Sequence, residues 1–151
     1  MSRNTIKSGF TLIEILIVIG IFGLIASLGF AIDLSFLRRD TMRAEQKIIV
    51  SALEKARSRS MSNVFESAHG FCYDGVSKNY IIFRNGVCAV SATSEIILAN
   101  VSIAGNPYST FPFLPIIFTQ LSGTTTDATI IIGDGVKSST ITINHEGTIN
   151  W

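Results

Sequence analysis

The stretch KSGFTLIEILIVIG, from Lys7 to Gly20, places a single carboxylate, Glu14, close to the start of a long apolar run. From Ile15 to Ile32 the chain has 18 residues without an ionisable side chain. Together with residues 10–13, this run reaches the roughly 20 residues that span a bilayer as a helix. The sequence therefore predicts one membrane-spanning helix over residues 10–35 that carries an acid near its start.

The segment before the apolar run is short and basic, which is also typical of a secretory signal. A cleavable signal has a shorter apolar core followed by a small-residue cleavage site. Cleavage after Ala31, which would release a secreted domain, therefore remains an alternative. Arg3 and Lys7 precede the run and favour a cytoplasmic amino terminus, although three arginines between residues 38 and 43 follow it. We expect the rest of the chain to be exported.

The region after the apolar run has the periodicity of an amphipathic helix. Apolar and small residues recur at spacings of three and four, with charged residues between them. This stripe comprises Ala44, Ile48, Ile49, Ala52, Leu53, Ala56, Ser60 and Val64. Since no glycine lies between Gly29 and Gly70, we predict one helix over residues 10–65, with an amphipathic stem at residues 36–66.

Residues 67–151 change to a period of two, punctuated by turn residues, which is typical of β-structure. In KNYIIFRNGVCAV, Asn85 and Gly86 lie between two β-rich runs and predict a hairpin. The other predicted strands are Gly70–Tyr73, Glu95–Ile103, Ile116–Gln120, Thr129–Ile132, Thr140–Asn144 and Thr148–Trp151. The predicted fold class is α+β, with a long amino-terminal helix packed on an antiparallel β head.

Cys72 and Cys88 are the two cysteines of the chain, and an exported location permits a disulfide between them. The predicted hairpin would place Cys88 opposite Phe83, with Cys72 on the far side of that strand. Two strand spacings separate thiols by about 10 Å, which exceeds disulfide reach. The sequence leaves open whether this possible disulfide forms. No histidine pair lies near the cysteines, so we expect no zinc site.

The polar residues do not assemble into a catalytic pattern. His69 and His145 fall at a strand start and in a turn, where surface positions are usual, and no nucleophile, base and acid combine around them. Asp127 and Asp134 lie among glycines and could bind calcium, but such acids are more typical of turns. We therefore expect no enzymatic activity, no cofactor and no bound metal.

Charge is concentrated on the stem, although the net charge of the chain is only +1. Between Arg38 and Arg59, seven basic side chains outnumber three acidic ones. This excess is typical of a solvated helix face or of a collar that contacts lipid headgroups, and a nucleic-acid patch is the alternative.

The string GFTLIE, residues 9–14, resembles the class III signal of type IV pilins and pseudopilins. In that family a membrane-embedded prepilin peptidase cuts between the glycine and the phenylalanine and methylates the new amino terminus. The resemblance implies a leader at residues 1–9, a cleavage site between Gly9 and Phe10, and an N-methylated Phe10. It also implies the architecture of a long helix carrying a β head.

The resemblance supplies a partner for Glu14. Cleavage leaves a positive amine on Phe10 in an apolar setting, where an unpaired charge costs several kcal/mol. As a subunit enters a filament, this amine can pair with the Glu14 carboxylate of a neighbour, which would make Glu14 a recruitment and register device. The implied partners are prepilin peptidase, other pilin or pseudopilin subunits, an inner-membrane assembly platform and, before assembly, membrane lipid. The implied location is a single-pass inner-membrane protein with an extracytoplasmic head, then a pilus or pseudopilus.

Two further stretches resemble the H-type minor pseudopilins and their FimT-like relatives. The stem stretch EKARSRSMSNVFE contains alanine, arginine and serine at 56–58, and STITINHEGTINW ends the chain with an apolar strand, a glycine turn and a short strand. The predicted function is a structural subunit of a type IV pilus or a type II secretion pseudopilus. The alternatives are a minor pilin that binds DNA or a surface, for natural transformation or adhesion, and a single-pass anchored exported domain. No lysine or arginine follows Lys137, so we do not expect the head to bind nucleic acid.

Overall fold

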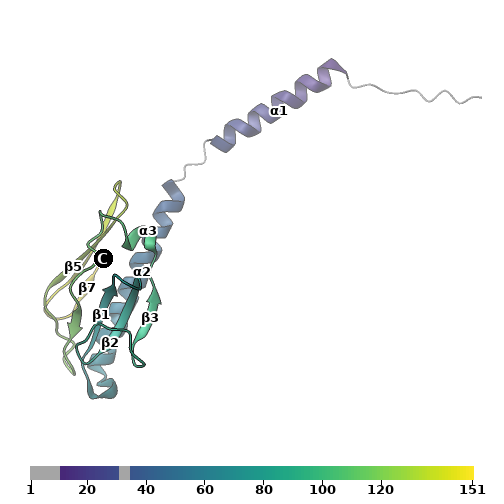
Figure 1. Cartoon of the computed structure of the whole chain (residues 1–151). Helices are drawn as coiled ribbons and strands as arrows, with labels where there is room; N and C mark the ends of the chain where they lie inside the picture. The colour runs from purple at the N-terminus through teal and green to yellow at the C-terminus, as the bar shows by residue number, and fades with distance from the viewer. Residues whose placement is uncertain (1–10, 31–34) are drawn as a thin grey trace, which may run out of the picture. The chain divides into compact units, whose positions relative to one another are not determined.

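The computed structural model describes residues 11–30 and 35–151, and the side chains of residues 11–27 and 40–151. The chain divides into two compact units, residues 1–37 and 38–151, which are described separately (Figure 1). The first contains helix α1 (Leu12–Phe30), and helix α2 (Ser35–Met61) lies almost entirely in the second. The residues that would join α1 to α2, 31–34, lie outside the described residues, so the predicted single helix remains a prediction.

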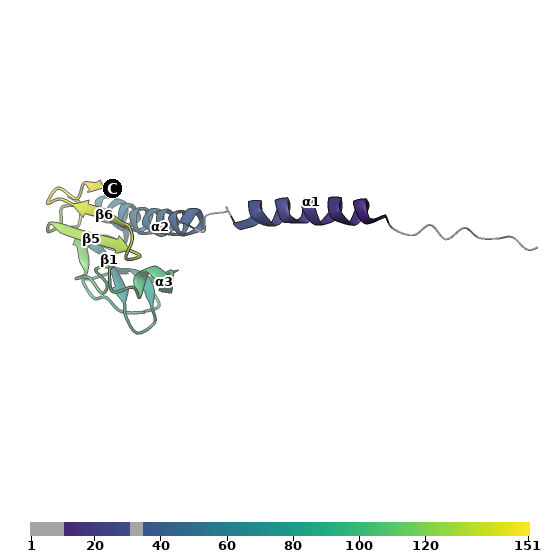
Figure 2. The ribbon, with the colours of Figure 1, turned by 90° about the horizontal axis from the view of Figure 1, so that it is seen from above.

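The second unit confirms the predicted α+β class, with every described strand pairing antiparallel. Two sheets form, one of four strands in the order β3-β2-β1-β4 and one of three in the order β5-β6-β7. Figure 2 shows α2 beside the strands of the head. The strands are β1 (His69–Asp74), β2 (Asn79–Arg84), β3 (Glu95–Leu98), β4 (Ile116–Phe118), β5 (Ala128–Gly133), β6 (Ser138–Ile143) and β7 (Ile149–Asn150). The short helices are η1 (Val64–Glu66) and α3 (Val101–Ala104).

Helix α2 ends at Met61, four residues before the predicted end. Asn63 has φ 53°, Phe65 has φ 55° and Glu66 has φ 51°, and this left-handed backbone cannot continue a right-handed helix. Gln120 donates a side-chain hydrogen bond to Asn63 Oδ1, and the Arg84 guanidinium lies 4.8 Å from the centre of the Phe65 ring. These contacts hold the turn that leads into β1.

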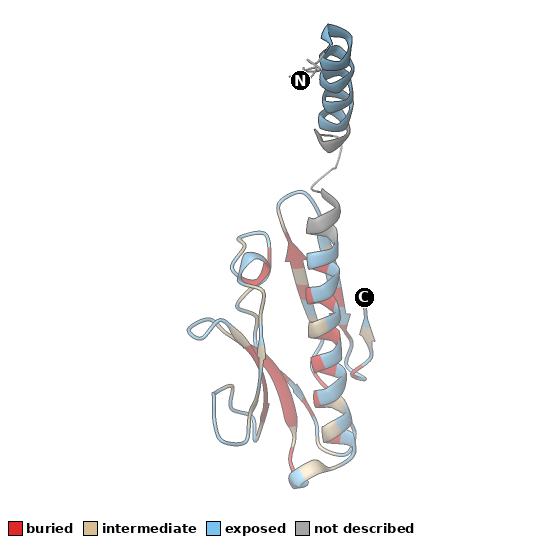
Figure 3. Ribbon diagram, turned by 90° about the vertical axis from the view of Figure 1, so that its right-hand side faces the viewer, coloured by how far each residue is buried: buried red, intermediate tan, exposed pale blue. Residues whose placement is uncertain are grey.

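One face of α2 packs against both sheets and forms the core of the head (Figure 3). The predicted stripe is correct from Ile49 to Ser60 but wrong at Ala44, which is exposed, while Met42 and Glu45 are buried. A residue five positions before Ile49 lies about 140° around a helix, whereas a residue four positions before it lies only about 40° away. The helical period therefore places Glu45, and not Ala44, on the packed face.

The predicted hairpin at Asn85-Gly86 is wrong, although the turn itself forms. Asn85 has φ 63° and Gly86 has φ 76°, the left-handed conformations that a tight turn requires. Residues 87–90 form no strand, because the two edges of β2 are already paired with β1 and β3. The predicted strand Glu95–Ile103 is also too long. It ends at Leu98, and Asn100 caps α3 by accepting a hydrogen bond from the Ser102 N–H at 3.0 Å.

A disulfide joins Cys72 to Cys88, with an S–S distance of 2.03 Å and a Cα–Cα distance of 6.2 Å. The separation of about 10 Å expected from strand spacing is wrong because Cys88 lies in a loop and not in a strand beside β2. Cys72 packs with Ile81 and Phe83, apart from the main core. Since side chains alternate along a strand, this second cluster lies on the face of the sheet opposite α2.

Candidate assembly site

Glu14 lies in the first turn of α1, where it and Thr11 exchange hydrogen bonds. The Thr11 N–H and hydroxyl donate to Glu14 Oε2 at 3.4 and 3.5 Å, and the Glu14 N–H donates to the Thr11 hydroxyl oxygen at 3.4 Å. This reciprocal pattern is a capping box, which satisfies N–H groups that a helix start leaves without partners. The negative charge of Glu14 also lies at the positive end of the helix dipole. The geometry turns the carboxylate back toward the amino terminus.

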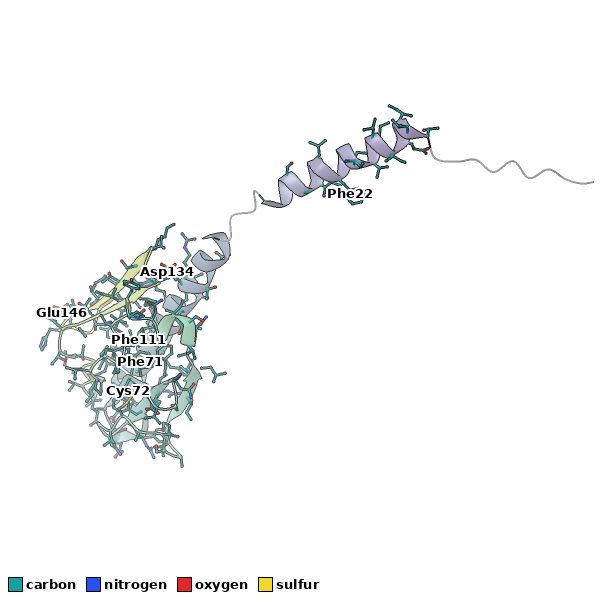
Figure 4. All side chains as sticks on the ribbon, turned by 45° about the horizontal axis from the view of Figure 1, so that its top comes forward. Phe22, Phe71, Cys72, Phe111, Asp134 and Glu146 are labelled. Carbon is teal, nitrogen blue, oxygen red and sulfur yellow. A yellow bond between two sulfur atoms is a disulfide. The ribbon has the colours of Figure 1, made fainter. Side chains whose placement is uncertain are left out.

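Between Ile15 and Ala26, α1 is apolar on all sides. Its described large apolar side chains, from Leu12 to Ile25, are between 44% and 77% exposed, and Figure 4 shows Phe22 projecting from the helix. Gly20 and Gly23 leave open space, with nothing within 4 Å of an added Cβ. A helix that is apolar all round is stable only when lipid or other helices cover it.

None of the helices in the described ranges, 11–30 and 35–151, combines the length and apolar character that a bilayer crossing needs. The predicted span, residues 10–35, reaches beyond the described residues at both ends. The predicted cleavage site and methylation site, Gly9 and Phe10, also lie outside the described residues. Their roles therefore remain predictions, whereas Thr11 and Glu14 have a described geometry.

A buried acid, Glu45, connects the stem to the head, and no pattern in the sequence pointed to it. Glu45 is only 2% exposed, and its Oε1 accepts hydrogen bonds from the Tyr80 hydroxyl at 2.7 Å and from the Asn100 N–H at 2.9 Å. Burial first, and then the bond to Glu45, raises the pKa of Tyr80 well above its usual range. Glu45 therefore fixes β2 and the start of α3 to α2.

Two of the basic stem residues pair with one acid of the head. Lys55 Nζ lies 2.5 Å and Arg59 Nη2 lies 2.7 Å from the two carboxylate oxygens of Glu95 at the start of β3. The hydrogen bond from Lys55, together with Arg59, lowers the pKa of Glu95. Two of the basic side chains that α2 carries in excess therefore have a structural role, because they hold β3, the edge strand of the four-stranded sheet, against the helix.

Arg57 connects α2 to the last turn of the chain. Its Nη2 donates a 3.0 Å hydrogen bond to the Glu146 carbonyl oxygen. Gly147 follows with φ 75°, and a Cβ added there would lie 2.2 Å from the Gly123 carbonyl oxygen. The glycine thus lets the turn approach both Arg57 and the 121–123 loop. This contact joins the two stretches that resemble H-type minor pseudopilins, the stem stretch and the final hairpin.

The remaining candidate residues occupy ordinary structural positions. His69 begins β1 as predicted, but its predicted surface position is wrong because the residue is buried, with Nδ1 3.1 Å from the Ser67 carbonyl oxygen. Asp134 forms a turn, accepting hydrogen bonds from the Val136 and Lys137 N–H groups.

Comparison with known proteins identifies the amino-terminal region. Residues 5–30 match the family model of the prokaryotic N-terminal methylation motif. This match supports the type IV pilin and pseudopilin family, and it implies a substrate of prepilin peptidase that assembles with other pilin subunits. Neither curated proteins nor solved structures give a match to the chain. The matched residues include the whole Thr11–Glu14 capping box.

Proposed function

We propose that the protein is a structural subunit of a type IV pilus or of a type II secretion pseudopilus. Prepilin peptidase cleaves it after Gly9, Phe10 is methylated, and the amino-terminal helix enters the filament. The match of residues 5–30 to the methylation motif carries this proposal. The apolar surface of α1 supports it, because a helix of this kind requires the cover that a bilayer or a bundle of subunits provides.

Glu14 has two successive partners in this mechanism. Before assembly its carboxylate accepts hydrogen bonds from Thr11, the residue that follows Phe10 in the sequence. During assembly it pairs with the Phe10 amine of a neighbour. In an apolar environment this attraction is strong, and a subunit out of register leaves both charges without a partner. The pairing thus selects both a processed subunit and the correct position.

Within the family, we propose that the protein is a minor subunit of the H type. The supporting observation is the Arg57–Glu146 contact, which joins the stem and hairpin stretches that resemble this subfamily. The head then serves as a rigid module on the filament stem. We assign it a structural role and no catalytic one.

Glu14→Ala tests the mechanism. We expect cleavage after Gly9 to continue, while incorporation into filaments drops at least about tenfold, because the loss of one partner of a buried charge pair costs several kcal/mol. Precursor and mature chains are separated by mass, and incorporation is measured in sheared filament fractions. The matched control is Glu146→Ala, an exposed acid of the head. Normal incorporation of Glu14→Ala would reject the pairing mechanism.

A further inference from the structure

A groove of about 480 Å³ lies between the last turns of α2 and the start of β7. Its α2 side includes Glu54, Arg57, Ser58 and Met61, and its other side includes Thr148 and Ile149. Met61 is 46% exposed there. The groove is therefore partly apolar, with hydroxyl groups, one carboxylate and one guanidinium in its lining.

The groove adjoins an unpaired edge of the three-stranded sheet. β7 is the last strand in the order β5-β6-β7, and Ile149 lies opposite Ile143 of β6. The Asn144 N–H donates to the Thr148 carbonyl oxygen at 3.1 Å, so the next pair in the ladder, Ile143 and Ile149, is a non-hydrogen-bonded pair. The N–H and C=O of Ile149 consequently point away from β6. An edge of this kind is a template for another strand.

Arg57 brings a positive charge to the same groove and forms no ion pair within residues 40–151, although the Glu54 side chain also lines the groove. Within residues 40–151, the ion pairs are those of Lys55 and Arg59 with Glu95. Arg57 is half-buried, its Nη2 is bonded to a carbonyl, and its Nε is buried without a hydrogen-bond acceptor. A half-buried guanidinium gains most from a carboxylate, which accepts charge-assisted hydrogen bonds.

We propose that this groove binds an extended polypeptide segment that carries a carboxylate side chain. The segment pairs with the outward N–H and C=O of Ile149 as a fourth strand, its carboxylate meets Arg57, and an apolar side chain covers Met61. This is recognition by strand addition, in which main-chain bonds give affinity and side-chain pockets give specificity. The inference does not depend on the proposed filament role, because it rests only on the second unit, residues 38–151.

A tethered strand tests the groove without knowledge of the natural partner. The full chain, in detergent micelles, is extended after Trp151 by the sequence Asn-Gly-Thr-Val-Glu-Val, which can turn back along β7. A short tether gives an effective concentration in the millimolar range. We expect the Ile149 amide to exchange its hydrogen at least about tenfold more slowly in the extended chain than in the parent, since pairing protects an amide from solvent.

Two changes test the ion pair between the added strand and Arg57. Replacing the glutamate of the added strand by glutamine removes the carboxylate and leaves residues 1–151 unchanged, whereas Arg57→Gln removes the guanidinium. Each change should raise the exchange rate of the Ile149 amide in the extended chain about tenfold. The two changes together should raise it little further, because both remove the same interaction. Arg43→Gln, an exposed arginine elsewhere on α2, is the matched control.

An unchanged exchange rate of Ile149 in the extended chain would overturn the proposal. So would an equal effect of Arg43→Gln and Arg57→Gln. If the added strand does not pair, and the parent chain instead binds a single-stranded oligonucleotide in a manner that Arg57→Gln abolishes, the groove is a nucleic-acid site and the proposal is likewise wrong.

Discussion

The Tyr80 hydroxyl donates a 2.7 Å hydrogen bond to Glu45, and both side chains are buried between the stem helix and the four-stranded sheet. Asn100 adds a backbone hydrogen bond to the same carboxylate oxygen. One acid of α2 therefore fixes two separate parts of the head. When the head is joined rigidly to the stem, the position of the stem helix determines the position of the head, as a filament subunit requires.

Replacing Glu45 tests this connection. We expect Glu45→Ala to lower the free energy of unfolding by about 2 to 4 kcal/mol, because the buried Tyr80 hydroxyl and the half-buried Asn100 N–H lose their acceptor. Glu45→Gln should cost less than about 1.5 kcal/mol, because the amide oxygen still accepts. Urea unfolding of residues 38–151, which contain the whole described core, measures the difference. Glu54→Ala, at an exposed position of the same helix, is the control. Equal effects of Glu45→Ala and Glu54→Ala would show that the buried acid does not hold the head.

The close packing of the last turn, at Gly147, can be tested by substitution. Gly147→Ala places a Cβ 2.2 Å from the Gly123 carbonyl oxygen at a φ of 75°, whereas Gly86→Ala meets open space at a φ of 76°. In both variants the left-handed backbone of the alanine lowers the free energy of unfolding by about 1 kcal/mol, but only Gly147→Ala adds a clash with the backbone. We expect Gly147→Ala to cost at least about 2 kcal/mol more than Gly86→Ala in thermal or urea unfolding. Similar costs for the two variants would mean that the turn is not packed as described.

The buried histidine gives the head a pH dependence. Burial, chiefly, lowers the pKa of His69 below its ordinary value of 6.5, with Arg59 and Arg84 acting in the same direction. As the pH falls below 6.5, the unfolded chain takes up a proton that the folded chain resists, so the free energy of unfolding decreases. At higher pH both states are neutral at this side chain and the loss disappears.

Urea unfolding between about pH 7.5 and pH 5.5 measures this slope, since most carboxylates stay ionised over that window. We expect His69→Gln to reduce the slope, whatever its effect on stability at neutral pH, and His145→Gln, at an exposed turn position, to leave it unchanged. An identical slope in the parent and in His69→Gln would contradict the assignment.

The fold class and the amino-terminal motif could be predicted from the sequence because each depends on local pattern. Helical periodicity fixed the packed face of α2 from Ile49 to Ser60, and alternation located most strands of the head. The strand predicted after Gly86 failed for a non-local reason. Asn85 and Gly86 determine a turn, but the strand that would follow needs a free edge, and β1 and β3 occupy both edges of β2.

The buried acid was unpredictable for a related reason. A glutamate among charged residues on a helix normally faces water, and only the fold brings Tyr80 and Asn100 to Glu45. The same applies to Cys72 and Cys88, whose contact depends on a loop and not on strand spacing. The Thr11–Glu14 capping box, in contrast, is readable from sequence as a threonine followed three residues later by glutamate.

We propose that the processed amino terminus of one subunit and Glu14 of its neighbour form the contact that joins subunits in the filament. The most direct test is mass spectrometry of the first peptide of chains recovered from assembled filaments. We expect a chain that begins with N-methylated Phe10. A filament chain that retains Met1, or one that begins after Ala31, would contradict it.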